Sequence, residues 1–184
     1  TWTWRHLAEQ VRLIAGGLAA AGLQAGQHII VVGDNRPRLS ASMLAAQSLG
    51  AIPVPLYQDA VGGEFVFPVN NAEVAFAVVE DQEQVDKLLE LREQCPVLAQ
   101  VWYDDPRGLR NYSEPGLASM DHLLESGARF AQEHRSIRCG QPTRTRYLES
   151  HISLQPLVPG QPYDTKAAST KNRLQFELLD MPRR

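Results

Sequence analysis

Four short apolar runs alternate with helix-like segments between residues 28 and 103, and this alternation limits the possible folds more than any other feature of the sequence. The runs cover residues 28–32, 51–56, 74–79 and 97–103. They are apolar along most of their length, as strands are when helices cover both faces of a sheet. Strands that alternate with helices through short links form parallel, doubly wound sheets. The sequence therefore predicts the α/β class, with a partial doubly wound parallel sheet and flanking helices.

The segments around these runs carry helix signals at their ends. Thr3 can cap an opening helix whose apolar residues recur every three or four positions. Asn35 can cap a second helix, with Pro37 in its first turn and Gly50 at its end. Asp81 can cap a third helix that has an acidic first turn. The apolar positions of the first two helices are Trp4, Leu7, Val11, Ile14, Leu18 and Ala21, and then Leu39, Met43, Leu44 and Leu49.

Prolines mark two weaker elements. Pro53 and Pro55 each remove a backbone N–H from the run 51–56, so this strand is expected to be very short or to lie at an edge of the sheet. Residues 62–71 are expected to form a poor helix, because Pro68 interrupts it.

The character of the sequence changes after about residue 134. Residues 135–184 hold nine Lys or Arg against four Asp or Glu, a balance of +5, whereas residues 1–134 have a balance of −8. The later segment also contains five prolines and keeps no regular hydrophobic period. We interpret residues 1–134 as the folded α/β portion and residues 135–184 as an irregular C-terminal tail, disordered or not native to the fold. The first residue is Thr1 rather than Met, which suggests a fragment.

Composition narrows the class of protein further. A net charge of −3 argues against a nucleic-acid binder, which would show a basic face. Cys95 and Cys139 form no CxxC motif, so neither a disulfide framework nor a zinc site is implied and a reducing compartment is expected. No run approaches the roughly 18 apolar residues of a membrane span. With no leader either, we predict a cytoplasmic protein without a transmembrane segment.

No familiar motif for phosphate, metal or nucleophile chemistry occurs. The turn after residue 32 reads Gly33-Asp34-Asn35, without the GxGxxG fingerprint, and residues 159–170 (PGQPYDTKAAST) mimic only part of a P-loop. The five histidines include no HExxH pair, and no GxSxG occurs. We therefore predict no catalytic, no cofactor-binding and no metal-ligating residue in this chain.

Two polar segments leave alternatives open. The acidic run has carboxylates that could work as an acid–base pair, but a solvated helix face is the favoured interpretation, with Glu83 and Lys87 paired at i, i+4. Residues 103–110 (YDDPRGLR) follow a strand, where open α/β sheets bind ligands, yet Asp-Asp-Pro is also an ordinary turn signal and the turn is favoured. The carboxylates of the acidic run are Glu80, Asp81, Glu83, Asp86, Glu90 and Glu93.

Several stretches together resemble the N-terminal part of bacterial long-chain acyl-CoA synthetases, which are AMP-forming members of the adenylate-forming superfamily. The resemblance begins at TWTWRHLAEQVRLIAGGLAAAGLQAGQHIIVVGDNRP, passes through LGAIPVPLY and VEDQEQVDKLLE, and continues to about LLESGARFAQEH, which covers most of residues 1–134. The resemblance implies an enzyme that uses ATP, Mg²⁺ and coenzyme A to activate a fatty acid as an acyl adenylate and then transfer it to CoA. The family's phosphate-gripping loop, close to TSGTTGxPKG, would follow soon after residue 134, and this sequence has no such loop there.

The lost resemblance implies that the chain is truncated or frameshifted after about residue 134, and we favour a shift of reading frame. The chain is then expected to be a ligase fragment that is inactive by itself. The alternative is a non-catalytic interaction or oligomerisation module that self-associates through an exposed sheet edge. A free-standing flavodoxin-like nucleotide binder is a weaker third interpretation, because no phosphate loop is visible.

Overall fold

The computed structural model of the protein describes residues 2–136, and residues 2–133 with their side chains. The predicted tail lies outside the described residues from position 137 onward. The division of the chain at residue 134 therefore stays a prediction.

A single sheet of five parallel strands forms the centre of the described part, in the order β2-β1-β3-β4-β5. The predicted doubly wound parallel sheet is confirmed, and β2 lies at an edge as its prolines indicated. The fifth strand was not foreseen, because it has three partly exposed residues and no apolar run. The strands are β1 (His28–Val32), β2 (Ile52–Leu56), β3 (Phe76–Val79), β4 (Gln100–Tyr103) and β5 (Leu117–Ser119).

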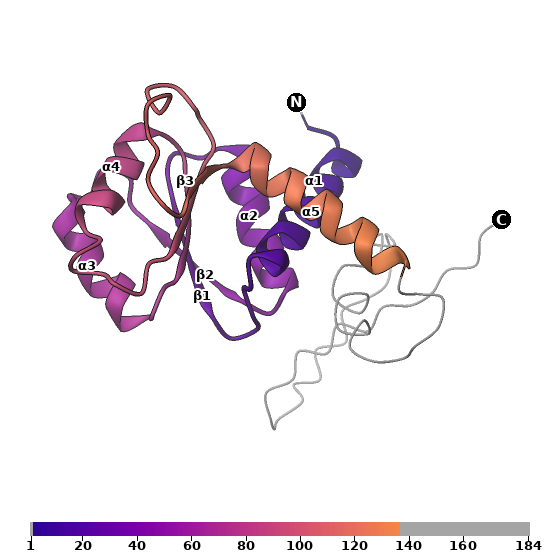
Figure 1. Ribbon diagram of the computed structural model, residues 1–184, viewed down its shortest axis with the longest axis horizontal. Coiled ribbons are helices and arrows are strands. Elements are labelled where there is room, and N and C mark those ends of the chain that lie inside the picture. The colour runs from indigo at the N-terminus through magenta and orange to yellow at the C-terminus, as the bar shows by residue number, and fades with distance from the viewer. Residues whose placement is uncertain (1, 137–184) are drawn as a thin grey trace, which may run out of the picture. The chain divides into compact units, whose positions relative to one another are not determined.

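Helices cover both faces of this sheet (Figure 1). Three lie on one face: α1 (Trp4–Ala20), α2 (Pro37–Ser48) and α5 (Met120–Ser136). Two lie on the other face: α3 (Gly62–Asn71) and α4 (Gln82–Glu90). None of the helices in the described part is long and apolar enough to cross a membrane.

The helix ends follow the sequence signals with one exception. The Thr3 hydroxyl accepts a hydrogen bond from the His6 N–H, and Asp81 accepts one from the Gln84 N–H, as predicted for N-caps. The expected Asn35 cap is wrong: the N-cap of α2 is Arg36, which makes no side-chain capping bond. In the turn before α2, the Asp34 N–H donates a hydrogen bond to the Glu80 carboxylate.

One residue of α1 lies elsewhere than its spacing predicted. Trp4, expected on the apolar face of α1, is 86% exposed in the first turn of this helix.

Helices α1 and α5 approach each other closely because glycines lie where they meet. A Cβ atom placed on Gly127 of α5 would lie 1.8 Å from the carbonyl oxygen of Leu13 in α1, and one on Gly17 would lie 2.3 Å from the carbonyl oxygen of Leu123. Side chains at these positions would force the two helices apart, so the contact depends on the absence of a Cβ.

Candidate functional site

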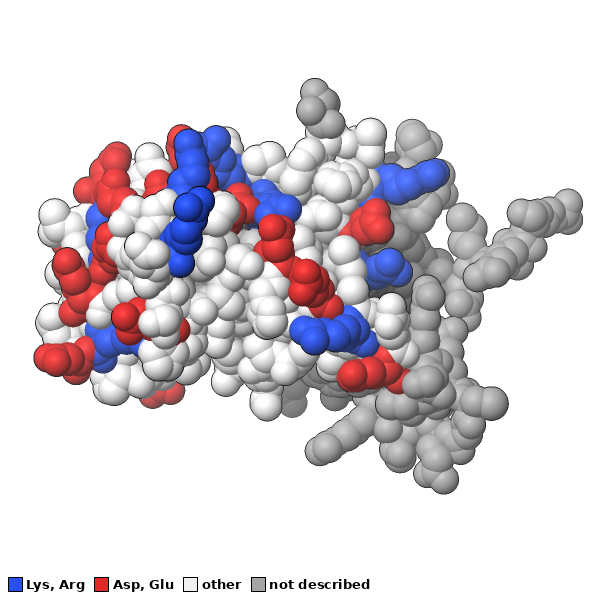
Figure 2. All heavy atoms as spheres, turned by 45° about the horizontal axis from the view of Figure 1, so that its top comes forward, with Lys and Arg blue, Asp and Glu red and all other residues white. Residues whose placement is uncertain are grey.

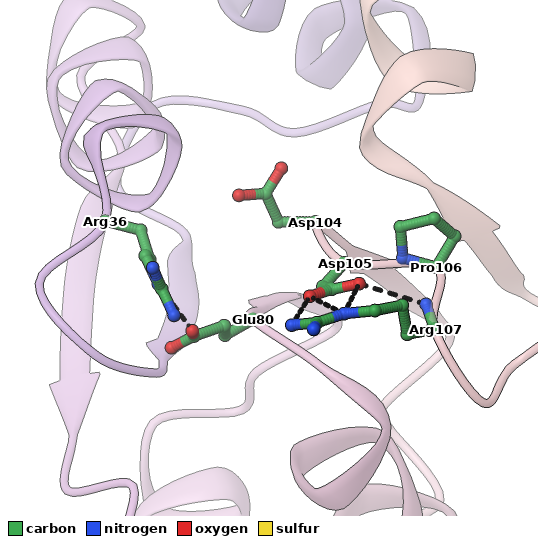
Figure 3. Close-up of a pocket in the computed structure, with 6 residues that line it drawn as sticks. All are labelled: Arg36, Glu80, Asp104, Asp105, Pro106 and Arg107. Atoms are coloured by element: carbon green, nitrogen blue, oxygen red, sulfur yellow. Dashed lines mark hydrogen bonds and ion pairs between the residues drawn. The ribbon is translucent and has the colours of Figure 1, made fainter. Parts of the chain in front are cut away.

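The loops that follow β1, β3 and β4 surround a small polar pocket at the carboxyl ends of the strands. The pocket has a volume of about 260 Å³ and is lined by Arg36, Glu80, Asp104, Asp105, Pro106 and Arg107 (Figure 3). It borders the point between β1 and β3 where the strand order reverses. Open α/β sheets bind their ligands in the crevice at this point, so the pocket is the candidate binding site of the described part.

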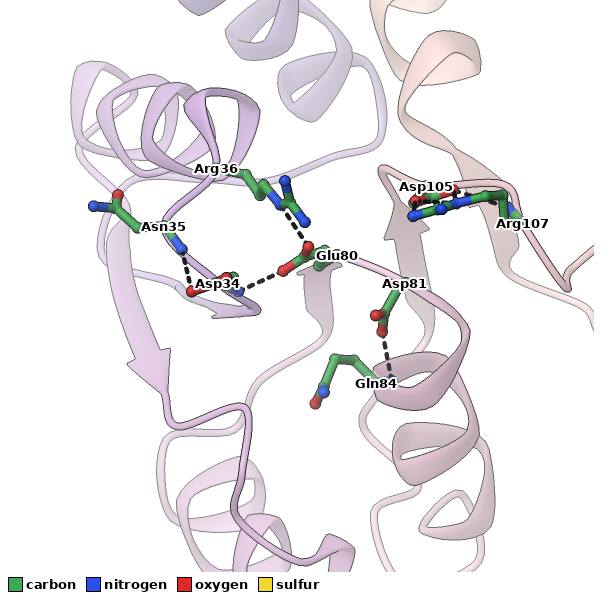
Figure 4. A network of polar contacts seen from close by, with 8 residues as sticks. All are labelled: Asp34, Asn35, Arg36, Glu80, Asp81, Gln84, Asp105 and Arg107. Atoms are coloured by element: carbon green, nitrogen blue, oxygen red, sulfur yellow. Dashed lines mark hydrogen bonds and ion pairs between the residues drawn. The ribbon is translucent and has the colours of Figure 1, made fainter.

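Glu80 occupies the centre of this region. It directly follows β3, it is 8% exposed, and its carboxylate accepts hydrogen bonds from the Asp34 N–H and from Nε of Arg36, the latter at 2.6 Å (Figure 4). The hydrogen bond to Glu80, together with the charge of that carboxylate, raises the pKa of the Arg36 guanidinium. The favoured interpretation of Glu80 as part of a solvated helix face is therefore wrong, because it precedes α4 and is buried against the turn after β1.

The turn after β1 is shaped to receive this carboxylate. Gly33 has φ +148°, and a Cβ atom there would lie 2.5 Å from the Cβ of Glu80. In nucleotide-binding α/β proteins the N–H groups of this turn and the following helix N-terminus bind phosphate. Here the Asp34 N–H is satisfied by a carboxylate of the protein itself. The turn thus binds an anionic side chain of the protein itself.

The loop after β4 makes the opposite wall of the pocket. Asp105 accepts hydrogen bonds from the backbone N–H of Arg107 at 3.0 Å and from its Nε at 2.7 Å, which closes a tight turn. This ion pair lowers the pKa of the Asp105 carboxyl and raises the pKa of the Arg107 guanidinium. The loop is joined to β3 by the Asp105 N–H, which donates to the Glu80 carbonyl at 2.7 Å. The segment therefore forms the turn that its sequence favoured.

A third group of ion pairs, made by Arg38, joins the site to the helices on one face of the sheet. Nη1 of Arg38 in α2 lies 3.1 Å from Oδ1 of Asp104 and 3.0 Å from Oδ1 of Asp121 in α5. With it, each charged residue that lines the pocket has a partner of opposite charge within the described part. The arrangement fixes loops and helix ends to one another; a nucleophile with an adjacent base is not part of it.

Other residues singled out in the sequence occupy structural positions. Cys95 is buried, and burial raises the pKa of its thiol, so it is a poor nucleophile. The hydroxyl groups of Ser42 and Ser48 donate to carbonyl groups of their own helix, those of Arg38 and Ala45. Within residues 2–133, no three His, Cys, Asp or Glu side chains gather as a metal site would require. The partial P-loop at 159–170 lies outside the described residues.

Charges of both signs lie close together on one face of the described part. Figure 2 shows Lys and Arg side chains next to Asp and Glu across the face that it presents. Such a mixed surface has no strong attraction for a polyanion.

Comparisons with known proteins agree with the resemblance noted in the sequence. The family described as AMP-binding enzyme matches residues 1–138. The chain is 25% identical over 126 residues to the long-chain-fatty-acid–CoA ligase FadD15 of Mycobacterium bovis, which covers 68% of this chain and 20% of that protein. It is 32% identical over 93 residues to long chain acyl-CoA synthetase 1 of Arabidopsis thaliana, covering 50% of this chain and 14% of that one.

A solved structure supports the same fold. Acetoacetyl-CoA synthetase from Streptomyces lividans superposes with a TM-score of 0.59 and 22% identity, over 66% of this chain and 20% of that one. This likeness concerns the fold. The chain spans about a fifth of the length of the mycobacterial relative that it matches.

Proposed function

The chain belongs to the family of AMP-binding enzymes, and from this premise we propose that it is the N-terminal α/β part of a long-chain fatty acid–CoA ligase. The complete enzyme would join a fatty acid to ATP, forming an acyl adenylate and releasing pyrophosphate. It would then transfer the acyl group to the thiol of CoA and release AMP. The similarity to two long-chain ligases supports this substrate class. We further propose a role in fatty acid metabolism and a cytoplasmic location.

Within such an enzyme, we assign residues 1–134 a scaffold role without adenylation chemistry of their own. The observation that carries this assignment is the Glu80 carboxylate at the point where the strand order reverses: it accepts a hydrogen bond from the Asp34 N–H, so that this N–H is not free for a ligand. ATP, Mg²⁺, CoA and the fatty acid would be held by the family's phosphate-gripping loop and later motifs. Phosphate positioning supplies much of the stabilisation of the transition state, so this chain should not adenylate fatty acids.

Pyrophosphate release tests the lack of activity. The 184-residue chain is incubated with ATP, Mg²⁺, CoA and palmitate, and a complete bacterial long-chain ligase serves as the positive control. We expect release at the rate of a blank without protein. Turnover that depends on both ATP and palmitate would refute the scaffold assignment.

A chimera tests the family role directly. Residues 1–134 replace the matching segment of the mycobacterial ligase, and acyl-CoA formation is measured with fatty acids from lauric to stearic. We expect ATP-dependent thioester formation, and its loss in a control chimera carrying Gly33→Val, whose side chain would collide with Glu80. A folded chimera that makes no thioester with any of these acids would contradict the proposal.

The tail is tested at the level of the gene. We propose that residues 135–184 arise from a shifted reading frame. Reading the coding DNA beyond codon 134 in all three frames should reveal a TSGTTG-like loop in another frame. If no frame encodes one, the tail is a protein sequence in its own right.

A second candidate is an interaction module that self-associates through the open edge of the sheet. It rests on the position of β2 at that edge, with Ile52 47% exposed. Static light scattering on the chain tests it, since a module of this kind should form dimers as concentration rises. The backbone of β2 argues against such pairing.

A further inference from the structure

The outer edge of β2 combines two features that normally promote association. It has no neighbouring strand on its outer side in the sheet of the described residues, and it carries exposed apolar surface at Ile52 and at Tyr57 just beyond it. An open edge of this kind is a template for pairing with a strand of another chain. The direction of its backbone groups decides whether pairing can occur.

The hydrogen bonds and register show which groups of β2 face outward. The Ile52 N–H donates to the Gln27 carbonyl at 2.8 Å, so position 52 faces β1, and the parallel register continues from Ile52 beside His28 to Leu56 beside Val32. Backbone groups alternate in direction along a strand. Val54 and Leu56 therefore also face β1, and positions 53 and 55 face away from the sheet.

Both outward positions are prolines. The N atoms of Pro53 and Pro55 carry no hydrogen, so the outer edge of β2 offers two carbonyl acceptors and no N–H donor between positions 52 and 56. The carbonyl groups of an added strand would find no N–H donor on this edge, and the added strand would meet two pyrrolidine rings. The β1–β2 ladder itself loses nothing, because it uses the alternate positions.

We propose that Pro53 and Pro55 make β2 a strand-excluding edge, which keeps a second copy of this chain from pairing with it. At the opposite edge of the sheet, β5 has three residues, so an added strand could form few hydrogen bonds with it. The inference does not depend on the ligase function, because it rests on the backbone of β2 alone.

The test restores the missing donors without adding apolar surface. The 184-residue chain is prepared as wild type and as the double variant Pro53→Thr/Pro55→Thr. The control variant, Pro96→Thr, changes an exposed proline in a loop. Light scattering is measured from micromolar to millimolar concentration, together with hydrogen exchange of residues 52–57. Circular dichroism confirms that each variant is folded, and the two single variants serve if the double variant is not.

We expect the wild type and the Pro96→Thr control to show no protection of residues 52–57 that grows with concentration. The double variant should rise from the monomer mass of 20.5 kDa toward twice that value, with residues 52–57 protected. A wild-type dimer protected at residues 52–57 would overturn the proposal. So would folded single and double variants that remain monomeric over the whole range.

Discussion

Replacing Gly127 by Ala should destabilise the protein, although alanine is the better helix former. The added Cβ would lie 1.8 Å from the carbonyl oxygen of Leu13 and 2.9 Å from the N atom of Gly17. A carbon–oxygen contact is comfortable at about 3.5 Å, so α5 would have to move away from α1 by more than an ångström. Both obstructing atoms belong to the backbone of a packed helix and cannot rotate out of the way.

The expected magnitude follows from two opposing effects. Overpacking of this kind costs typically ~1–3 kcal/mol, and a backbone obstruction places it at the upper end. The helix propensity of alanine returns up to ~1 kcal/mol. The free energy of unfolding should therefore fall by about 2 kcal/mol, and with a urea dependence of about 2 kcal/mol per molar the midpoint should fall by about 1 M.

Gly63→Ala is the matched control, because it is the same change in another helix. Gly63 lies in the first turn of α3, and a Cβ there would meet no atom within 4 Å. It should leave the free energy of unfolding unchanged or raise it by up to ~1 kcal/mol, so the urea midpoint should not fall. Urea unfolding followed by circular dichroism compares the two variants. If Gly127→Ala proves as stable as Gly63→Ala, then α1 and α5 do not pack in solution as described.

Two substitutions and one labelling experiment probe the polar site and the core. Glu80→Gln should lower the free energy of unfolding by about 1 kcal/mol, because a neutral amide weakens the hydrogen bond to the turn after β1. The ion pair with half-exposed Arg36 adds little to this loss. An unchanged urea midpoint would contradict the anchoring role of Glu80. The ion pair with Arg107 lowers the pKa of Asp105 in the folded state. The stabilisation from this pair is therefore present above the unfolded-state pKa of about 3.9 and is lost as pH falls through the lower folded-state pKa. The melting temperature of Asp105→Asn should fall less than that of the wild type when pH is lowered through these two pKa values, and an equal fall in variant and wild type would refute the argument. The Cys95 thiol, buried and raised in pKa, should react with iodoacetamide at neutral pH only after unfolding, as peptide mapping would show, whereas labelling of the native protein at the rate of a free thiol would place it at the surface.

Local signals in the sequence determined most of the architecture. The apolar runs, the caps at Thr3 and Asp81, and the prolines of 51–56 each depend on residues a few positions apart, so they predicted the parallel sheet, two helix starts and the edge strand correctly. Two elements were not predicted: β5, since three partly exposed residues carry no period, and α5, which lies beyond the alternating runs of residues 28–103. The Asn35 cap failed because α2 begins one residue later than expected, at Pro37, with Arg36 at its N-cap.

The polar site could be recognised only in the folded chain. Glu80 and Asp34 are separated by 46 positions and meet because β1 and β3 are neighbours in the sheet. One sequence signal was available: Asp81 begins the helix, so Glu80 must precede it and end a buried strand. The contact of α1 with α5 likewise joins glycines more than a hundred residues apart. Spacing along the chain determines which helices and strands form, but the order of the strands decides which loops meet, and strand order is set by packing between elements far apart in the sequence.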